Sequence, residues 1–171
     1  MKIKDSHQKA LQKLFPGKEQ AFIDATLDRA IQQEEAKQTR KLTLFADGGS
    51  RGNPGPSGGG FSIIRGSDEV AHGAEFYGEL TNNQAEYLAL RDALRTAYEL
   101  DPEGSVECFM DSNLVVQQLK GEFKVKSPNV KALFEEVRRI ADQFPHFDIH
   151  HIPREQNKRA DALANRAMDR G

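Results

Sequence analysis

The stretch Leu42-Thr43-Leu44-Phe45-Ala46-Asp47 decides how this chain is expected to fold. A mostly apolar run precedes a carboxylate, which predicts a core strand with an acidic residue at its carboxyl end. A second run, Val106-Glu107-Cys108-Phe109-Met110, is followed in the same way by Asp111. Because ligands of α/β proteins gather beyond the carboxyl ends of strands, Asp47 and Asp111 are expected to meet if their strands are neighbours.

Two further acidic residues fall on predicted helices. Glu86 is followed at i+4 and i+7 by Leu90 and Ala93, so it shares the face that packs inward. Asp161 lies near the edge of the apolar face of the last predicted helix, residues 157–168. Burial of one unpaired carboxylate costs several kcal/mol, on the order of the stability of a small domain. Four converging carboxylates therefore indicate bound divalent cations, which prefer oxygen ligands.

The order of elements predicts an α/β fold. The predicted strands span residues 41–47, 59–65, 69–77, 105–110 and 147–152. The predicted helices span residues 81–99, 112–120, 127–143 and 157–168. An antiparallel meander followed by alternating helices and strands predicts a mixed five-stranded sheet with helices on both faces. Thr81 is the predicted N-cap of its helix, and Pro128 takes the favoured first helical position.

Bulk composition limits the class of protein. A length of 171 residues suits one domain with a small appendage. The formal net charge of −2 excludes a strong overall positive field of the kind that attracts nucleic acid nonspecifically. A single cysteine, Cys108, rules out an intramolecular disulfide. With no apolar leader and no run long enough to span a bilayer, we expect a cytoplasmic protein without a membrane partner.

Four strings occur in order along the chain: Asp47-Gly48-Gly49-Ser50-Arg51-Gly52-Asn53-Pro54-Gly55, Thr81-Asn82-Asn83-Gln84-Ala85-Glu86, Asp111-Ser112 and Asn157-Lys158-Arg159-Ala160-Asp161-Ala162-Leu163-Ala164. Together they resemble the type 1 ribonuclease H family over roughly Lys41 to Asp169. The resemblance implies a ribonuclease H-like fold. It also implies an endoribonuclease that cuts the RNA strand of an RNA–DNA hybrid and leaves 3′-hydroxyl and 5′-phosphate ends.

The resemblance assigns the four acids to two Mg²⁺ ions, for which Mn²⁺ is a candidate substitute. By this resemblance Asp47 bridges both ions, Glu86 and Asp111 hold one, and Asp161 holds the other. Such a pair activates a water and stabilises the leaving oxygen of a phosphodiester. Two alternatives stay open: a DNA-processing nuclease of the same fold and a non-catalytic hybrid-binding module. Double-stranded RNA stays open as a second substrate.

The glycine-rich stretch after Asp47 is interpreted as a loop whose small residues let a nucleic-acid backbone approach closely. Contacts to ribose 2′-hydroxyls distinguish RNA from DNA. The residues expected to make them are Ser50, Gly52, Asn53, Asn82 and Asn83. By the resemblance, Thr81 contacts a phosphate of the DNA strand, although N-capping alone also accounts for it. Asn113 stands where the family often has a glutamine that contacts a base.

The chain departs from the family pattern in two places. Some members carry a long basic insertion, whereas residues 120–126 predict only a short loop, so binding should be weaker and more salt-sensitive. The mobile catalytic histidine of the family would fall near His151, but that position reads as part of a strand. Arg154 is therefore the preferred auxiliary residue, and it would position phosphate or water because arginine does not give up its proton.

The N-terminal residues 1–40 predict two short helices separated by Phe15-Pro16-Gly17. We expect a helical hairpin that precedes a catalytic domain of residues 41–171. The hairpin would dock on that domain, on a second copy of the chain or on another protein. An accessory nucleic-acid-binding element is the remaining alternative.

Overall fold

The computed structural model describes residues 5–17 and 20–171. The chain divides into two compact units, Met1–Thr39 and Arg40–Gly171. The first contains helices α1 (Asp5–Leu14) and α2 (Gln20–Thr39). Helix α2 is 20 residues long, so the prediction of a short helix is wrong for it. The charged stretch near its C-terminal end, up to Thr39, continues the helix. Residues 1–4 and 18–19 of the predicted hairpin lie outside the described residues.

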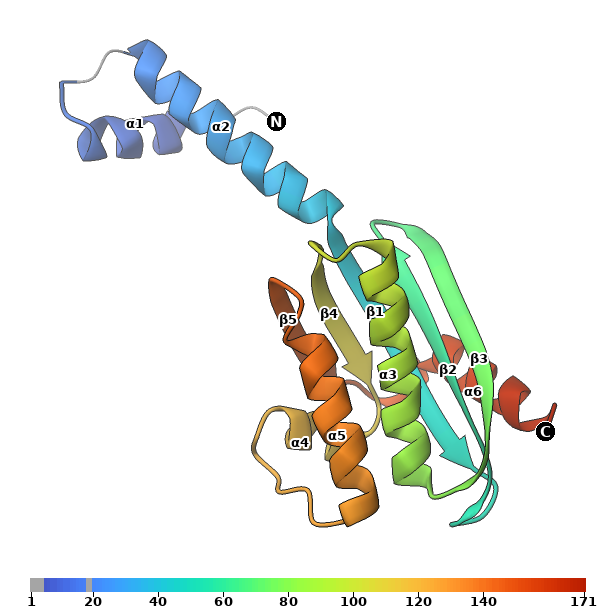
Figure 1. Cartoon of the computed structure of the whole chain (residues 1–171). Coiled ribbons are helices and arrows are strands. Elements are labelled where there is room, and N and C mark those ends of the chain that lie inside the picture. Colours follow the sequence, from blue (N-terminus) through green and yellow to red (C-terminus); the bar gives the residue numbers. More distant parts are fainter. Residues whose placement is uncertain (1–4, 18–19) are drawn as a thin grey trace. The chain divides into compact units, whose positions relative to one another are not determined.

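The second unit is built on a five-stranded sheet (Figure 1). Its strands are β1 (Lys41–Ser50), β2 (Gly55–Arg65), β3 (Asp68–Leu80), β4 (Ser105–Met110) and β5 (His146–His151). The strand order is β3-β2-β1-β4-β5. Strand β1 runs antiparallel to β2 and parallel to β4, which confirms the predicted mixed sheet.

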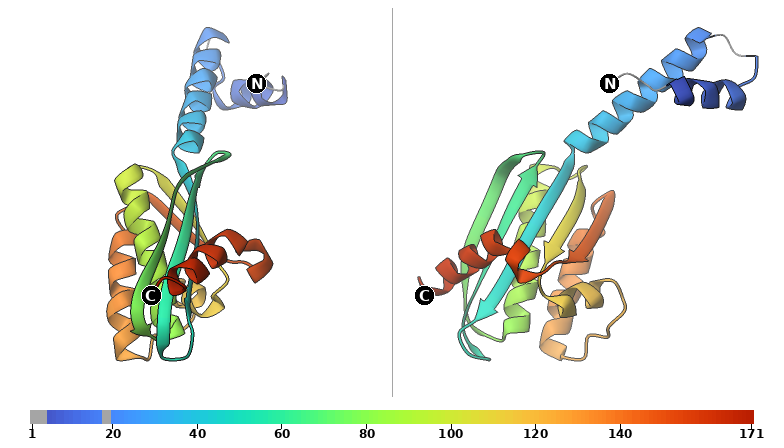
Figure 2. Two further views of the ribbon diagram at one scale, coloured as in Figure 1. Left: turned by 90° about the vertical axis from the view of Figure 1, so that its right-hand side faces the viewer. Right: turned by 180° about the vertical axis from the view of Figure 1, so that it is seen from behind.

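Helices cover both faces of the sheet, as predicted (Figure 2). They are α3 (Asn82–Leu100), α4 (Asn113–Leu119), α5 (Pro128–Ala141) and α6 (Lys158–Met168), with a 3₁₀ turn η1 (Arg154–Gln156) before α6. Helices α3 and α5 lie over one face and α6 lies over the other. The core between them is closed by fully buried side chains of β1 and α3, among them Leu42, Leu44, Leu90 and Leu94. None of the described helices has the length and apolar character needed to cross a bilayer.

The start of α3 has the cap that the sequence predicts. The Thr81 hydroxyl accepts a hydrogen bond from the Gln84 backbone N–H, and the Gln84 side chain accepts one from the Thr81 N–H. This reciprocal capping box satisfies two backbone donors that a helix start otherwise leaves unpaired. Pro128 begins α5 as predicted.

The glycine-rich stretch is mostly strand, not loop. Residues 47–50 pair with residues 57–60 across β1 and β2, which leaves only residues 51–54 as the turn. A Cβ on Gly60 would lie 2.4 Å from the Ala164 nitrogen and 2.5 Å from the Ala160 oxygen. The interpretation of these glycines as room for a nucleic acid is therefore wrong for Gly60, because α6 occupies that space.

Replacement of Gly60 by alanine should destabilise the domain strongly. The new methyl group would meet the backbone of α6, which cannot rotate away, so we expect a loss of about 3 kcal/mol. For a chain of this size that loss corresponds to a decrease of about 10 °C in the melting temperature.

Gly49→Ala is the matched control for this substitution. Its Cβ would meet only the terminal methyl of Met168, at 3.1 Å, and an unbranched side chain can move aside. Thermal unfolding followed by circular dichroism compares the two variants. Equal melting temperatures would contradict the packing role assigned to Gly60.

Candidate active site

The parallel pairing of β1 with β4 places two acidic residues side by side. The register aligns Phe45 with Phe109, so Asp47 and Asp111 lie level with each other where β4 ends, while β1 continues to Ser50 in its pairing with β2. The two carboxyl groups are close enough for the charge of Asp111 to raise the pKa of Asp47. Asp47 is 8% exposed and thus nearly buried. The structure therefore brings together the two strand-end carboxylates that the sequence singled out.

Glu86 approaches Asp47 because β1 and α3 touch at a glycine. A Cβ on Gly48 would lie 2.2 Å from the carbonyl carbon of Ala85 and 2.3 Å from the nitrogen of Glu86. Only a residue without a side chain permits this approach of strand to helix. The Gly48 backbone N–H also donates a hydrogen bond to the Glu86 carboxylate, which is 6% exposed. The other carboxylate oxygen, Oε2, is buried and makes no hydrogen bond.

The electrostatics of these acids favour a bound cation. The pKa of Asp47 is raised to about 7, mainly by burial and to a smaller extent by the charges of Asp111 and Asp161. The pKa of Glu86 is raised well above its ordinary value, mainly by burial and to a smaller extent by the charges of Asp47 and Asp111. A positive ion would relieve both effects and would give the unpaired Glu86 oxygen a partner. The donor set, four carboxylates and no soft ligand, fits a hard divalent cation.

The carboxylates meet in pairs rather than as a finished ligand cage. Within residues 5–17 and 20–171, no group of three or more histidine, cysteine or acidic side chains has the spacing that holds a metal ion. Asp47 contacts Asp111, whereas Asp161 forms an ion pair with Arg154. Binding of an ion by all four residues would therefore require these side chains to adjust.

Arg154 reaches the site from η1, a turn that the sequence did not predict. Its guanidinium donates to the Asp161 carboxylate, and its side chain is 71% exposed. The hydrogen bond and charge of Asp161 raise the pKa of Arg154 still further, so it stays a fixed positive charge. His151 is the exposed last residue of β5, aligned with Met110. This placement agrees with the preference for Arg154, whose auxiliary role stays a prediction.

Asn157 is a buried positioning residue that the sequence analysis gave no role. Its Nδ2 donates to the Ala46 carbonyl oxygen at 3.0 Å and to Asp111 Oδ1 at 2.8 Å. The side chain is 1% exposed, and it makes no capping bond to α6. One amide therefore joins the ends of β1 and β4 to the start of the helix that carries Asp161. No local signal in the sequence distinguishes this role, because an asparagine at a helix start is expected simply to cap the helix.

The turn after β1 is tied to the start of α3. The Asn82 backbone N–H donates to Asn53 Oδ1 at 3.2 Å, which brings the two strings of expected ribose contacts together. Ser50 Oγ donates to the carbonyl oxygens of Gly55 and Leu80, so its hydroxyl already has a structural use. In the same turn, Gly52 has a φ of +119°, a backbone conformation that favours glycine.

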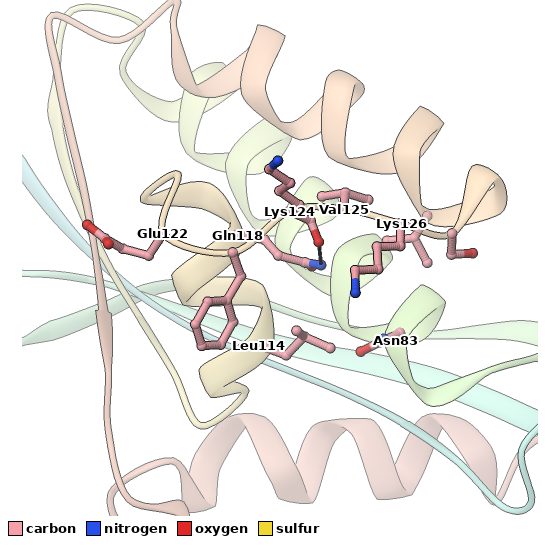
Figure 3. A pocket seen from close by; sticks show the side chains of 10 residues that line it. Asn83, Leu114, Gln118, Glu122, Lys124, Val125 and Lys126 are labelled. Atoms are coloured by element: carbon pink, nitrogen blue, oxygen red, sulfur yellow. Dashed lines mark hydrogen bonds between the residues drawn. The ribbon is translucent and has the colours of Figure 1, made fainter.

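The other expected substrate contacts lie toward α4. The Thr81 hydroxyl donates to Gln84 Oε1 at 2.8 Å, so the capping interpretation holds for it. Asn113 begins α4 and its Oδ1 accepts a hydrogen bond from Gln117 at 3.2 Å. Asn83 lines a pocket of about 640 Å³ that residues 122–126 of the loop after α4 also line (Figure 3).

Comparison with known proteins agrees with this geometry. A family model described as reverse transcriptase-like matches residues 45–167. A bifunctional protein of Mycobacterium tuberculosis is 42% identical over 134 residues, which make up 75% of this chain and 36% of that protein. A ribonuclease HI of Halobacterium salinarum is 41% identical over 130 residues, 75% of this chain and 65% of that protein. The solved structure of LC11-RNase H1 with an RNA/DNA hybrid has a TM-score of 0.72 and 40% identity, and the match covers 75% of this chain and 97% of that one.

The chain belongs to the type 1 ribonuclease H family. The family resemblance predicted from four short strings is confirmed. The chain spans about a third of the mycobacterial relative and about two thirds of the halobacterial one. Family membership implies a divalent metal cofactor, in agreement with the acidic donor set described above.

The raised pKa of Asp47 predicts how the metal-free protein responds to pH. An aspartate in an unfolded chain titrates near about 3.9, whereas Asp47 in the folded chain titrates at about 7. Between these values the folded state binds the additional proton, so the free energy of unfolding decreases as the pH rises through this window. Asp47→Asn should abolish this contribution and raise the melting temperature in EDTA at about pH 8.

Thermal unfolding in EDTA at about pH 5 and about pH 8 tests this effect. The variant should melt higher than the original chain at the higher pH, and the difference should shrink at the lower pH. Asp142→Asn is the control, because Asp142 lies exposed at the end of α5. If the difference in melting temperature between the variant and the original chain were the same at both pH values, the ionised form of Asp47 would not be destabilised by its surroundings.

Proposed function

We propose that this chain is an endoribonuclease that hydrolyses the RNA strand of RNA–DNA hybrids and leaves 3′-hydroxyl and 5′-phosphate ends. The observation that carries the proposal is the convergence of Asp47, Glu86, Asp111 and Asp161 from four separate elements at one edge of the sheet. Relatives named ribonuclease HI, and a structural neighbour bound to an RNA/DNA hybrid, support the substrate class.

The proposed cofactor is a pair of Mg²⁺ ions, with Mn²⁺ as a substitute. When bound, they would supply an activated water and stabilise the leaving oxygen in line with it. The four carboxylates would hold them, and Gly48 and Asn157 would fix the orientations of Glu86 and Asp111 through their hydrogen bonds. Arg154 would hold a phosphate oxygen at the rim, since a guanidinium donates hydrogen bonds but does not accept a proton.

Substrate choice is proposed to depend on two surfaces beside the carboxylates. The turn that carries Ser50, Gly52 and Asn53 is bonded to Asn82, and together they would meet ribose 2′-hydroxyls of the strand to be cut. On the other side, the lysines of the loop after α4 would contact the paired DNA strand, with Thr81 and Asn113 at its edges, and Asn83, which lines the same pocket, would meet a ribose 2′-hydroxyl of the strand to be cut. Double-stranded RNA would satisfy the first surface, and its cleavage is an outcome that the assay below measures.

We also propose that the unit Met1–Thr39 is an attachment element for a second copy of the chain or for another protein. Leu14 is 71% exposed and Phe22 is 44% exposed in this unit. Phe15 packs edge-to-face on Phe22, with the ring centroids 5.9 Å apart. Exposed apolar side chains grouped in this way favour a contact with a partner.

One assay separates the proposed activity from its rivals. Labelled RNA–DNA hybrid, duplex DNA and double-stranded RNA are each incubated with the protein in Mg²⁺ and in EDTA. We expect cleavage of the hybrid that requires Mg²⁺, and a loss of at least about a hundredfold in Asp47→Asn, equivalent to about 2.7 kcal/mol of barrier. Asp142→Asn should cut normally. Cleavage of duplex DNA would favour the DNA-processing nuclease, and binding without cleavage would favour the binding module.

The auxiliary role of Arg154 has a separate test. Arg154→Ala should slow single-turnover cleavage by roughly tenfold or more, because a fixed donor to phosphate is lost at the rim of the site. His151→Ala removes an exposed side chain at the end of β5 and should leave the rate nearly unchanged. Both variants should melt close to the original chain. A large loss of rate in His151→Ala with an unchanged melting temperature would reverse the assignment.

A further inference from the structure

A buried tyrosine–glutamine pair lies next to the site, and the proposed chemistry does not use it. Tyr87 follows Glu86 on α3 and is completely buried. Its hydroxyl donates to Gln118 Oε1 on α4 at 2.8 Å. Gln118 is itself only 6% exposed, and the Tyr87 ring packs edge-to-face on Phe134 of α5. The pair therefore links three helices on one face of the sheet.

The other end of the glutamine amide holds the loop that follows α4. Gln118 Nε2 donates to the Lys124 carbonyl oxygen at 3.4 Å, the bond drawn as a dashed line in Figure 3. The hydroxyl of Tyr87 occupies the amide oxygen, so the amide nitrogen is directed to the loop. The result is a relay with one direction, from the Tyr87 hydroxyl through Gln118 to the Lys124 carbonyl.

The second half of the loop is held by this relay and by Val125, which packs against the hydrophobic core. The first half is fixed by backbone bonds: the N–H groups of Glu122 and Phe123 both donate to the Gln117 carbonyl oxygen. Past Phe123 the chain runs without a helix or strand until α5 begins at Pro128. The Lys124 carbonyl is thus held by a side chain, and replacement of that side chain would release it without altering any strand.

The loop matters because it forms a wall of the pocket that Asn83 lines on the opposite side. Lys124 and Lys126 both line the pocket, but the Lys124 ammonium is directed away from Asn83, so Lys126 supplies the positive charge on that wall (Figure 3). The Lys126 ammonium lies toward Asn83 in Figure 3. Asn83 precedes Glu86 by three residues, about one turn of α3. One helix therefore fixes the distance between the pocket and the acidic cluster, and the relay fixes the opposite wall.

We propose that Tyr87 and Gln118 are positioning residues for substrate binding. Through the Lys124 carbonyl they hold the loop so that Lys126, in the orientation of Figure 3, faces the phosphates of a nucleic-acid backbone passing through the pocket. The inference rests on the proposed function and adds to it how this chain, with its short loop, binds the duplex beside the carboxylates. The Lys126 ammonium matches the charge and hydrogen-bonding capacity of a phosphate group.

The central test is Tyr87→Phe, which keeps the ring and removes the hydroxyl. Gln118 Oε1 then loses its buried donor, the amide can rotate, and the Lys124 carbonyl loses its tether. We expect KM for the hybrid to rise by about fivefold while kcat stays within about twofold, because binding is weakened equally in the ground and transition states. The slope of log Kd against log salt should decrease by about one, as for the loss of one phosphate contact.

The affinity is measured by fluorescence anisotropy of a labelled hybrid, with Tyr87→Phe added to the cleavage-deficient Asp47→Asn chain. Tyr77→Phe is the matched control. The Tyr77 hydroxyl is also largely buried and donates to Asp92 at 2.8 Å, but it lies on β3, on no wall of the pocket. It should lower the melting temperature without altering Kd or the salt slope.

Gln118→Met is a second variant with the same expected effect on Kd, because it keeps the length of the side chain and removes both hydrogen bonds. Lys126→Ala combined with Tyr87→Phe should weaken binding by less than the product of the single effects, since both act on one contact. If the original chain cleaves the hybrid but Tyr87→Phe and Gln118→Met leave both Kd and the slope of log Kd against log salt unchanged, the inference is overturned. A lower kcat at constant KM would also overturn it, since Tyr87 would then act on Glu86. Absence of hybrid cleavage by the original chain would instead refute the proposed function.

Discussion

The repulsion among buried carboxylates is the constraint on which the rest of this structure depends. Asp47 and Glu86 are both nearly buried, the charge of Asp47 raises the energy of ionised Glu86, and the charges of Asp111 and Asp161 raise that of ionised Asp47. The fold holds them together because β1 is a central strand, paired on both sides, and α3 packs on it through the missing side chain of Gly48. The buried carboxylates thus destabilise the folded state at one end of the central strands, and packing of the core offsets this loss, as is common at sites that bind a cation.

Helix α3 connects this constraint to substrate binding. Within five consecutive residues, 83–87, it carries a wall of the pocket, a carboxylate of the acidic cluster and the donor of the buried relay. The same helix buries Leu90 and Leu94 in the core, so its position is set by packing and cannot shift easily. The capping box at Thr81 fixes where the helix begins and therefore the phase of all these side chains. The packing of α3 in the core consequently also determines the geometry of the site.

The parts of the fold and site that could be predicted from the sequence are those set by local pattern. Apolar runs before Asp47 and Asp111 predicted two core strands whose carboxylates would meet if the strands were neighbours, and the spacing of Glu86 placed it on a buried face. The contacts that escaped prediction join residues far apart in the chain. Asn157 reaches Ala46 across 111 positions and Tyr87 reaches Gln118 across 31, and no local pattern specifies such pairs. Gly60 was misread for the same reason, because its neighbour α6 lies a hundred residues later in the chain.

A net charge of −2 is compatible with a polyanionic substrate because the positive charges are placed locally. Arg154 lies against Asp161 at one rim of the acidic cluster, and Lys126 lies across the pocket from Asn83. Few cations face the substrate, so each must be held where a phosphate passes, since an exposed side chain loses entropy when it forms an ion pair. A long basic insertion can contact phosphates with many flexible positive side chains. A short loop has few, so each must be held in the right place, which explains why a buried tyrosine and glutamine would hold the backbone of this loop.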